Sequence, residues 1–258
     1  MTSEGLADGP ETYTVTVVDS YDLLSALAAD AVSETLANRP GAALTLPTGD
    51  TPLGMYRELV RRIDAGELDF SQAQFFCLDD YLGSTPDDEA SLTRWLKQVF
   101  LDPARLPEAN VHYVPTAAAD PQAAAAGYDR EIAACGGLEL AVVGLGPNGH
   151  IGFNEPGSGP DDPTRVVDLQ PATRAQSAAY WDGKADIPAQ AMTIGLGTIL
   201  QAKRIVLIVS GAGKAEIVQK SLEGPETTEV PGSFLRRAGS RLEVILDQGA
   251  ASKLSPRQ

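Results

Sequence analysis

The sequence is poor in histidine, cysteine and positive charge. Of its 258 residues only two are histidine and two are cysteine, and 35 acidic side chains outnumber 20 basic ones, for a net charge of −15. Nucleic acids and anionic membranes are bound by clustered Lys and Arg, so neither is expected as a partner. An anionic ligand would have to be held locally, by backbone N–H groups and a few cations.

Long apolar runs are also absent. No stretch approaches the roughly 20 residues that a membrane helix needs. Cys77 and Cys135 stand in apolar surroundings, which argues against a disulfide framework. The opening MTSEGLADGP has neither the positive region nor the apolar region of a signal peptide. We therefore expect a disordered tail at residues 1–11 and a reduced, cytoplasmic protein.

Short β-rich runs alternate with segments of helical periodicity. Apolar, non-alternating strands separated by helices are typical of a parallel sheet that is covered on both faces. No repeat, linker or break in composition divides the chain. We predict a single doubly wound, Rossmann-like α/β domain over residues 12–258, with segments 160–190 and 224–240 as loops and short helices. The predicted strands are YTVTVV (13–18), AALTL (42–46), QFFCL (74–78), LELAVV (138–143) and RIVLIV (204–209).

Four of these strands run directly into unusual loops. In parallel sheets, ligands bind outside the carboxyl ends of the strands. All four loops are therefore expected at one edge of the sheet, where they would form a binding site. The loops are LPTGDTP (46–52), LDDYLG (78–83), GLGPNGHIGFNEP (144–156) and SGAGK (210–214).

The first and last of these loops suit a phosphate. Thr48 and Gly49 lie in a turn that leads to a helix, where Thr51 is expected as the N-cap, and free N–H groups and the helix dipole there attract anions. Lys214 could meet the phosphate as a point charge. Asp50 opposes anion binding unless its carboxylate points away or is neutralised. The plain alternatives are an ordinary capped turn and a surface lysine.

The second loop places two carboxylates side by side. Since side chains alternate along a strand, one of Asp79 and Asp80 can face the crevice while the other faces the protein or solvent. A partly desolvated carboxylate can serve as a general base. The alternative is an aspartate that caps a helix or a turn.

The third loop is the most specific. His150 carries an imidazole, the side chain that most often moves protons in enzymes. Glu155 could hold and polarise it, and Asn148 offers a donor and an acceptor. A structural histidine is the alternative reading. The loop glycines, which allow close approach to a ligand and positive φ, are Gly144, Gly146, Gly149 and Gly152.

Other kinds of site find little support. His112 has no comparable neighbours and is expected to be structural. No group of His, Cys and Asp has metal-ligand spacing, and no GxGxxG motif follows the first strand as a dinucleotide site requires. We expect neither a metal nor a cofactor.

Five stretches together resemble the glucosamine-6-phosphate deaminase/isomerase family, over about residues 42–250. The related 6-phosphogluconolactonases share the fold but lack the NEP triplet and usually carry arginine where Tyr81 stands. The stretches that carry the resemblance are PTGDTPLGMY, LDDYLG, GLGPNGHIGFNEPGSG, AMTIGLGTIL and SGAGKA.

The resemblance implies a reaction and a set of roles. An amino-sugar 6-phosphate, most readily glucosamine 6-phosphate, would be isomerised and deaminated to fructose 6-phosphate and ammonia, in amino-sugar catabolism that includes the use of N-acetylglucosamine. His150, oriented by Glu155 and Asn148, would open the sugar ring. Asp79 would move the proton from C2 to C1. The substrate-binding set would be Thr48, Gly49, Asp50, Thr51, Gly144, Gly152 and Lys214.

The chain also departs from the family pattern. Ala179 stands where the family has an arginine on the phosphate, and Asp50 where Gly or Ser is usual. Val167 and Asp168 replace the Lys and Thr of allosterically activated members, which argues against activation by an N-acetylated sugar phosphate. A different or unphosphorylated amino sugar, a lactonase reaction and a non-catalytic sugar-phosphate sensor therefore stay as alternatives. The sequence leaves a homo-oligomer open.

Overall fold

The computed structural model describes residues 13–181 and 187–255, so the expected tail at 1–11 lies outside the described residues. Its larger sheet has seven strands in the order β1-β10-β9-β6-β2-β3-β5, and every pairing in it is parallel. These strands are β1 (Thr14–Val18), β2 (Ala43–Thr45), β3 (Gln74–Phe76), β5 (Val111–His112), β6 (Leu140–Val143), β9 (Arg204–Val209) and β10 (Leu242–Asp247).

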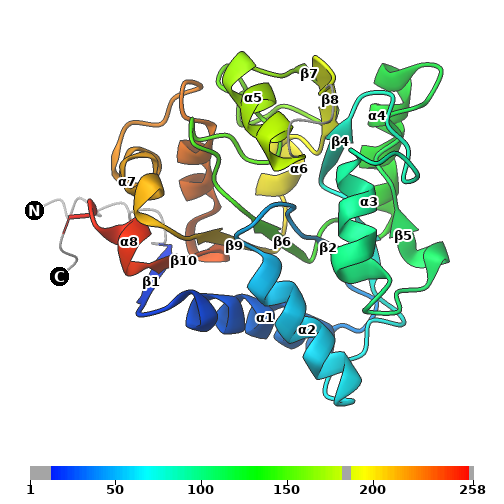
Figure 1. Cartoon of the computed structure of the whole chain (residues 1–258), viewed down its shortest axis with the longest axis horizontal. Coiled ribbons are helices and arrows are strands. Elements are labelled where there is room, and N and C mark those ends of the chain that lie inside the picture. Colours follow the sequence, from blue (N-terminus) through cyan, green and yellow to red (C-terminus); the bar gives the residue numbers. More distant parts are fainter. Residues whose placement is uncertain (1–12, 182–186, 256–258) are drawn as a thin grey trace, which may run out of the picture.

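Helices lie on both sides of this sheet. In Figure 1, α1 and α2 run along its lower side, whereas α5 and α6 lie above it. The predicted class, a mostly parallel sheet with helices on both faces, is confirmed. The helices are α1 (Tyr21–Asn38), α2 (Leu53–Asp64), α3 (Leu92–Leu96), α4 (Pro121–Ala134), α5 (Pro171–Tyr180), α6 (Leu196–Leu200), α7 (Ala215–Glu223) and α8 (Gln248–Ala251). The π-helix is η1 (Lys97–Leu101), and the 3-10 helices are η2 (Glu108–Asn110), η3 (Ala212–Lys214) and η4 (Pro231–Arg241).

A second, antiparallel sheet has the order β4-β8-β7 and was not predicted. It comprises β4 (Asp79–Tyr81), β8 (Gln190–Thr193) and β7 (Arg165–Asp168). The segment expected as loops and short helices at 160–190 thus also contains a strand and the ten-residue helix α5. Strand β7 escaped prediction because it is short and only partly buried, so it carries no apolar run.

The order of the strands brings the four loops together. Strands β9, β6, β2 and β3 are consecutive neighbours in the parallel sheet. The loops at 210–214, 144–156, 46–52 and 78–83 follow those strands in that order, so they lie along one carboxyl edge. This edge is the place where the sequence predicts a binding site.

The central strands hold that edge in place by burial. Every residue of β6 and β2 is buried, and β9 is buried from Ile205 onward. Burying a valine, leucine or isoleucine side chain contributes about 1.5–3 kcal/mol to the stability of the fold.

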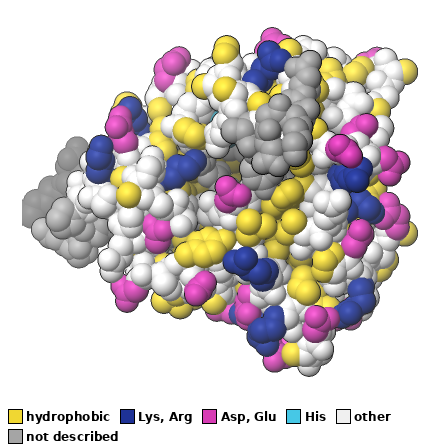
Figure 2. Space-filling model, viewed as in Figure 1, with side chains coloured by type: hydrophobic (Ala, Val, Ile, Leu, Met, Phe, Trp, Pro, Cys, Tyr) yellow, Lys and Arg dark blue, Asp and Glu magenta, His cyan; other side chains and the backbone are white. Residues whose placement is uncertain are grey.

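Within the described residues no helix is both long and apolar enough to cross a membrane. Basic side chains on the face drawn in Figure 2 are interspersed with acidic ones.

Candidate active site

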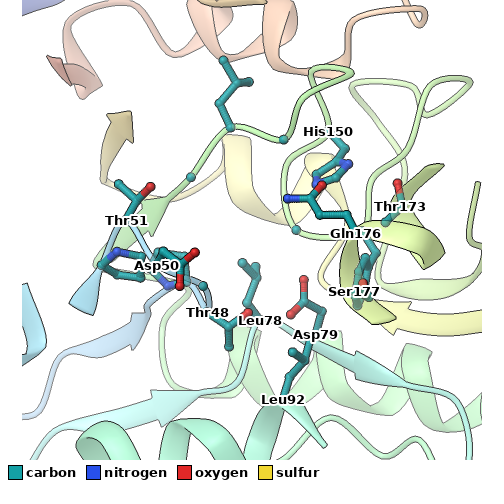
Figure 3. A pocket seen from close by; sticks show the side chains of 18 of the residues that line it. Thr48, Asp50, Thr51, Leu78, Asp79, Leu92, His150, Thr173, Gln176 and Ser177 are labelled. Carbon is teal, nitrogen blue, oxygen red and sulfur yellow. The ribbon is translucent and has the colours of Figure 1, made fainter. Parts of the chain in front are cut away.

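A cavity of about 260 Å³ opens at the carboxyl edge of the parallel sheet, and Figure 3 shows its lining from close by. All four predicted loops contribute to it. Of the predicted site residues, those that line the cavity are Thr48, Gly49, Asp50, Thr51, Asp79, Gly144, His150, Gly152 and Lys214. Asn148 and Glu155 do not line it and stand behind His150 instead.

Asp79 occupies a dry position in the cavity wall. Its residue is 5% exposed, and its Oδ1 atom has no hydrogen-bond partner. Burial, with a smaller contribution from the neighbouring Asp80, raises the pKa of the Asp79 carboxyl to about 8. A carboxyl that titrates close to neutrality can both take up and release a proton under ordinary conditions, as a general base must.

Asp80 points the opposite way, as strand alternation predicts. Its carboxylate accepts hydrogen bonds from the Ser91 hydroxyl at 2.6 Å and from the N–H groups of Leu92 and Thr93 at 3.0 Å each. These donors lie at the beginning of α3, which leaves N–H groups without partners inside the helix. The helix-capping role considered for this pair therefore belongs to Asp80.

His150 is held in the glycine-rich turn by close backbone contacts. The N–H of Gly146 donates to the His150 carbonyl at 2.9 Å, and Gly149 closes the turn with φ +86°. The imidazole lies directly against Gly146, where an added Cβ would come within 2.1 Å of Nε2. Only glycine at position 146 leaves room for this ring orientation.

Glu155 links the imidazole to the protein behind it. Its Oε2 lies 3.5 Å from Nδ1 of His150 and accepts a hydrogen bond from Nδ2 of Asn148 at 2.8 Å. Its Oε1 accepts from the N–H of Gln170 at 3.3 Å. Burial raises the pKa of Glu155, but bonds from His150, Thr173 and Asn148 outweigh that effect and leave the pKa below its usual value. The carboxylate therefore stays ionised and can stabilise a protonated imidazole.

The loop after β2 is held by a residue that the sequence did not single out. The Tyr21 hydroxyl donates toward the carbonyls of Asp50 and Thr51, at 3.1 and 3.0 Å, and accepts from the N–H of Gly54 at 2.8 Å. The predicted N-cap is wrong, because α2 begins at Leu53 and has no side-chain cap. Tyr21 satisfies one of the N–H groups that a capping side chain would otherwise take.

Lys214 reaches the cavity from η3, but it does not neutralise Asp50. Its ammonium donates to the carbonyl of Leu145 at 2.6 Å, and burial lowers its pKa. No ion pair joins Lys214 to Asp50 among the described residues. Ala179 falls in α5, and its side chain lies outside the described part of the structure.

Helix α5 supplies a wall of the cavity that the sequence analysis missed. Thr173, Gln176 and Ser177 line the cavity from this helix (Figure 3). The helix carries alanines and polar residues but no run of large apolar side chains, so no strong periodicity marks it. His112, in contrast, lies outside the cavity, where it stacks on Phe76 with ring centroids 4.1 Å apart.

The arrangement can exchange protons with a bound molecule from two sides, through Asp79 and through His150. Over residues 13–181 and 187–255 no group of three or more His, Cys, Asp or Glu side chains could hold a metal ion. Asp79 and His150 thus place two side chains capable of acid–base chemistry next to a loop suited to an anion.

Comparisons with known proteins agree with this description. Residues 19–244 match the family described as glucosamine-6-phosphate isomerases/6-phosphogluconolactonase. A glucosamine-6-phosphate deaminase of Rhodopirellula baltica is 41% identical over 244 residues, which cover 94% of this chain and 96% of that protein. One of an Arthrobacter species is 39% identical over 240 residues, covering 93% and 92%.

Solved structures extend the comparison. A monomeric glucosamine-6-phosphate deaminase matches with a TM-score of 0.89 at 35% identity, covering 93% of this chain and 99% of that one. The 6-phosphogluconolactonase of Trypanosoma brucei matches with a TM-score of 0.75 at 20% identity, covering 95% and 100%, a likeness of fold alone. The chain belongs to the glucosamine-6-phosphate isomerase/6-phosphogluconolactonase family, and the resemblance of its motifs is confirmed.

Proposed function

We propose that this protein is a glucosamine-6-phosphate deaminase, which converts glucosamine 6-phosphate and water to fructose 6-phosphate and ammonia. The observation that carries the proposal is the pairing of a buried, unpartnered carboxyl with an imidazole across one cavity. The deaminases of about 40% identity over nearly the whole chain support the choice of substrate.

The proposed reaction begins with opening of the pyranose ring. His150 takes the proton of the C1 hydroxyl and returns a proton to the ring oxygen, which leaves an open-chain aldehyde. Glu155, ionised and 3.5 Å from Nδ1, stabilises the imidazolium formed in between. Asn148 fixes that carboxylate through its bond of 2.8 Å.

Isomerisation follows at the Asp79 carboxylate. It removes the proton from C2, which carries the amine, and an enol-type intermediate forms. The same carboxyl then delivers the proton to C1 of that intermediate. The product is an imine at C2, to which water adds and from which ammonia leaves. Because the carboxylate form is required and the pKa lies at about 8, kcat/KM should rise with pH up to that region.

Phosphate binding falls to the loop after β2 and to Lys214. Thr48, Gly49 and Thr51 offer backbone N–H groups and hydroxyls at the cavity wall, and Lys214 brings a cation to the same cavity. Asp50 has no described ion pair and faces this cavity. That single feature favours a second candidate, the same chemistry on an unphosphorylated amino sugar.

The test is ammonia release from glucosamine 6-phosphate, glucosamine and a panel of their epimers, with lactone hydrolysis of 6-phosphogluconolactone measured alongside. We expect glucosamine 6-phosphate to give the highest kcat/KM. Asp79→Asn should lower turnover by at least about a hundredfold, the scale of a lost general base. Preference for glucosamine would favour the second candidate, and hydrolysis of the lactone alone would refute both.

A further inference from the structure

Helix α5 presents three polar side chains to the cavity, and two of them already have partners. Thr173 hydrogen-bonds the carboxylate of Glu155. Ser177 hydrogen-bonds the hydroxyl of Tyr81. The third, Gln176, lines the cavity with an exposed side chain. Its amide forms no hydrogen bond with any described residue, so it is available to a ligand.

The orientation of Gln176 limits what that ligand group can be. Figure 3 shows its amide directed into the cavity next to His150, whereas Asp50 and Thr51 lie across the cavity. The phosphate donors proposed above belong to that opposite side. A sugar with its phosphate at the loop and its reacting carbons near Asp79 would therefore place part of its hydroxyl-bearing chain beside Gln176.

We propose that Gln176 is a substrate-binding residue that hydrogen-bonds a hydroxyl of the sugar chain. The inference rests on the proposed function, because it takes an amino-sugar phosphate as the ligand. A primary amide has two N–H donors and an acceptor oxygen, and a hydroxyl both donates and accepts. A phosphate only accepts hydrogen bonds, so the acceptor oxygen of the amide would have no partner on it.

The size of the effect follows from the kind of bond. A neutral hydrogen bond formed in exchange for bonds to water corresponds to roughly a three- to tenfold change in an equilibrium constant. Gln176→Ala should therefore lower kcat/KM for glucosamine 6-phosphate by about that factor. Folding should be unaffected, because the amide has no described partner in the protein.

The experiment compares Gln176→Ala with Gln122→Ala, which removes an exposed glutamine from α4, outside the cavity. Both variants and wild type are assayed for ammonia release from glucosamine 6-phosphate and from its 3-deoxy and 4-deoxy analogues. We expect Gln176→Ala to lose activity on the parent sugar but to match wild type on the analogue that lacks the contacted hydroxyl. Gln122→Ala should match wild type on all three.

A further variant separates a hydroxyl from a phosphate as the bound group. Gln176→Glu keeps an acceptor for a hydroxyl but would repel a phosphate, so its loss on glucosamine 6-phosphate should not exceed that of the alanine variant. A much larger loss, or a loss that vanishes on unphosphorylated glucosamine, would overturn the hydroxyl assignment. Equal activity of the Gln176→Ala and Gln122→Ala variants, or an equal loss on both deoxy analogues, would overturn the inference alone. No ammonia from wild type would instead overturn the proposed function, and the inference with it.

Discussion

Asp79→Asn should gain stability relative to wild type as the pH rises, because wild type loses stability that the variant keeps. Burial and Asp80 raise the pKa of Asp79 from 3.8 to about 8. Between these values the native state holds a proton that the unfolded state has released. Each unit of pH in that window therefore costs the native protein about 1.4 kcal/mol of unfolding free energy, and the loss levels off above the native pKa.

The expected difference can be stated for a practical pH range. Between pH 6 and pH 9 wild type should lose roughly 2–3 kcal/mol through this group. Asparagine does not titrate, so Asp79→Asn should escape that part of the decline. All other titrating groups contribute to both proteins and largely cancel in the comparison. Urea unfolding of wild type and variant at pH 6, 7, 8 and 9 measures the difference directly.

Asp80→Asn is the matched control. In wild type the Asp80 carboxylate accepts hydrogen bonds from Ser91, Leu92 and Thr93, whereas Asp79 Oδ1 has no such partner. It should destabilise the protein even at pH 6, where Asp79→Asn should not. If the free-energy difference between Asp79→Asn and wild type stayed constant from pH 6 to pH 9, the buried carboxyl would not titrate as described. Its assignment as a base with a pKa near neutrality would then be wrong.

Three further predictions concern the cavity. Gly146→Ala should displace the imidazole of His150 and lower kcat, because the new Cβ would come within 2.1 Å of the ring. Gly213→Ala is the control and should retain activity, since a Cβ at that position meets nothing within 4 Å. Equal kcat values for the two variants would refute the contact. His150→Gln should bind an acyclic substrate analogue as wild type does while losing turnover of the cyclic sugar. His112→Gln is the control and should keep turnover. Equal losses on cyclic and acyclic ligands would exclude a ring-opening role for His150. Asp50→Ser should lower KM for glucosamine 6-phosphate by removing a negative charge from the cavity wall, without changing KM for glucosamine, and a higher KM would show that Asp50 binds the substrate.

The parallel sheet and the meeting of its four loops were predictable because the strands can be recognised in the sequence. Runs such as RIVLIV are continuous and apolar, as strands buried on both faces must be. Parallel strands have their carboxyl ends at one edge, so the neighbourhood of Asp79, His150 and Lys214 followed from topology alone. The roles assigned to these residues stay predictions until the variants are measured.

Other parts of the site left no comparable signal. Helix α5 is made mostly of small and polar side chains, so its three cavity residues fell in a segment predicted as loops and short helices. Tyr21 lies 29 residues before Asp50, whose carbonyl it binds, and nothing local to either segment indicates that contact. Strand alternation predicted that Asp79 and Asp80 diverge, but which of them meets α3 depended on the pairing of β4, a long-range feature.

That pairing makes strand register a determinant of chemistry. β4 is held antiparallel to β8 with Asp79 opposite Thr193 and Asp80 opposite Met192. A slip of one residue would exchange the faces of the whole strand. A slip in one direction would place Asp79 where Asp80 now meets α3, and a slip in the other would place Asp80 where Asp79 now lines the cavity; neither slip would fill both positions with a carboxylate. Two chemically identical side chains thus owe their different surroundings to a backbone alignment, and an insertion or deletion of one residue beside β4 would leave one of the two positions without a carboxylate.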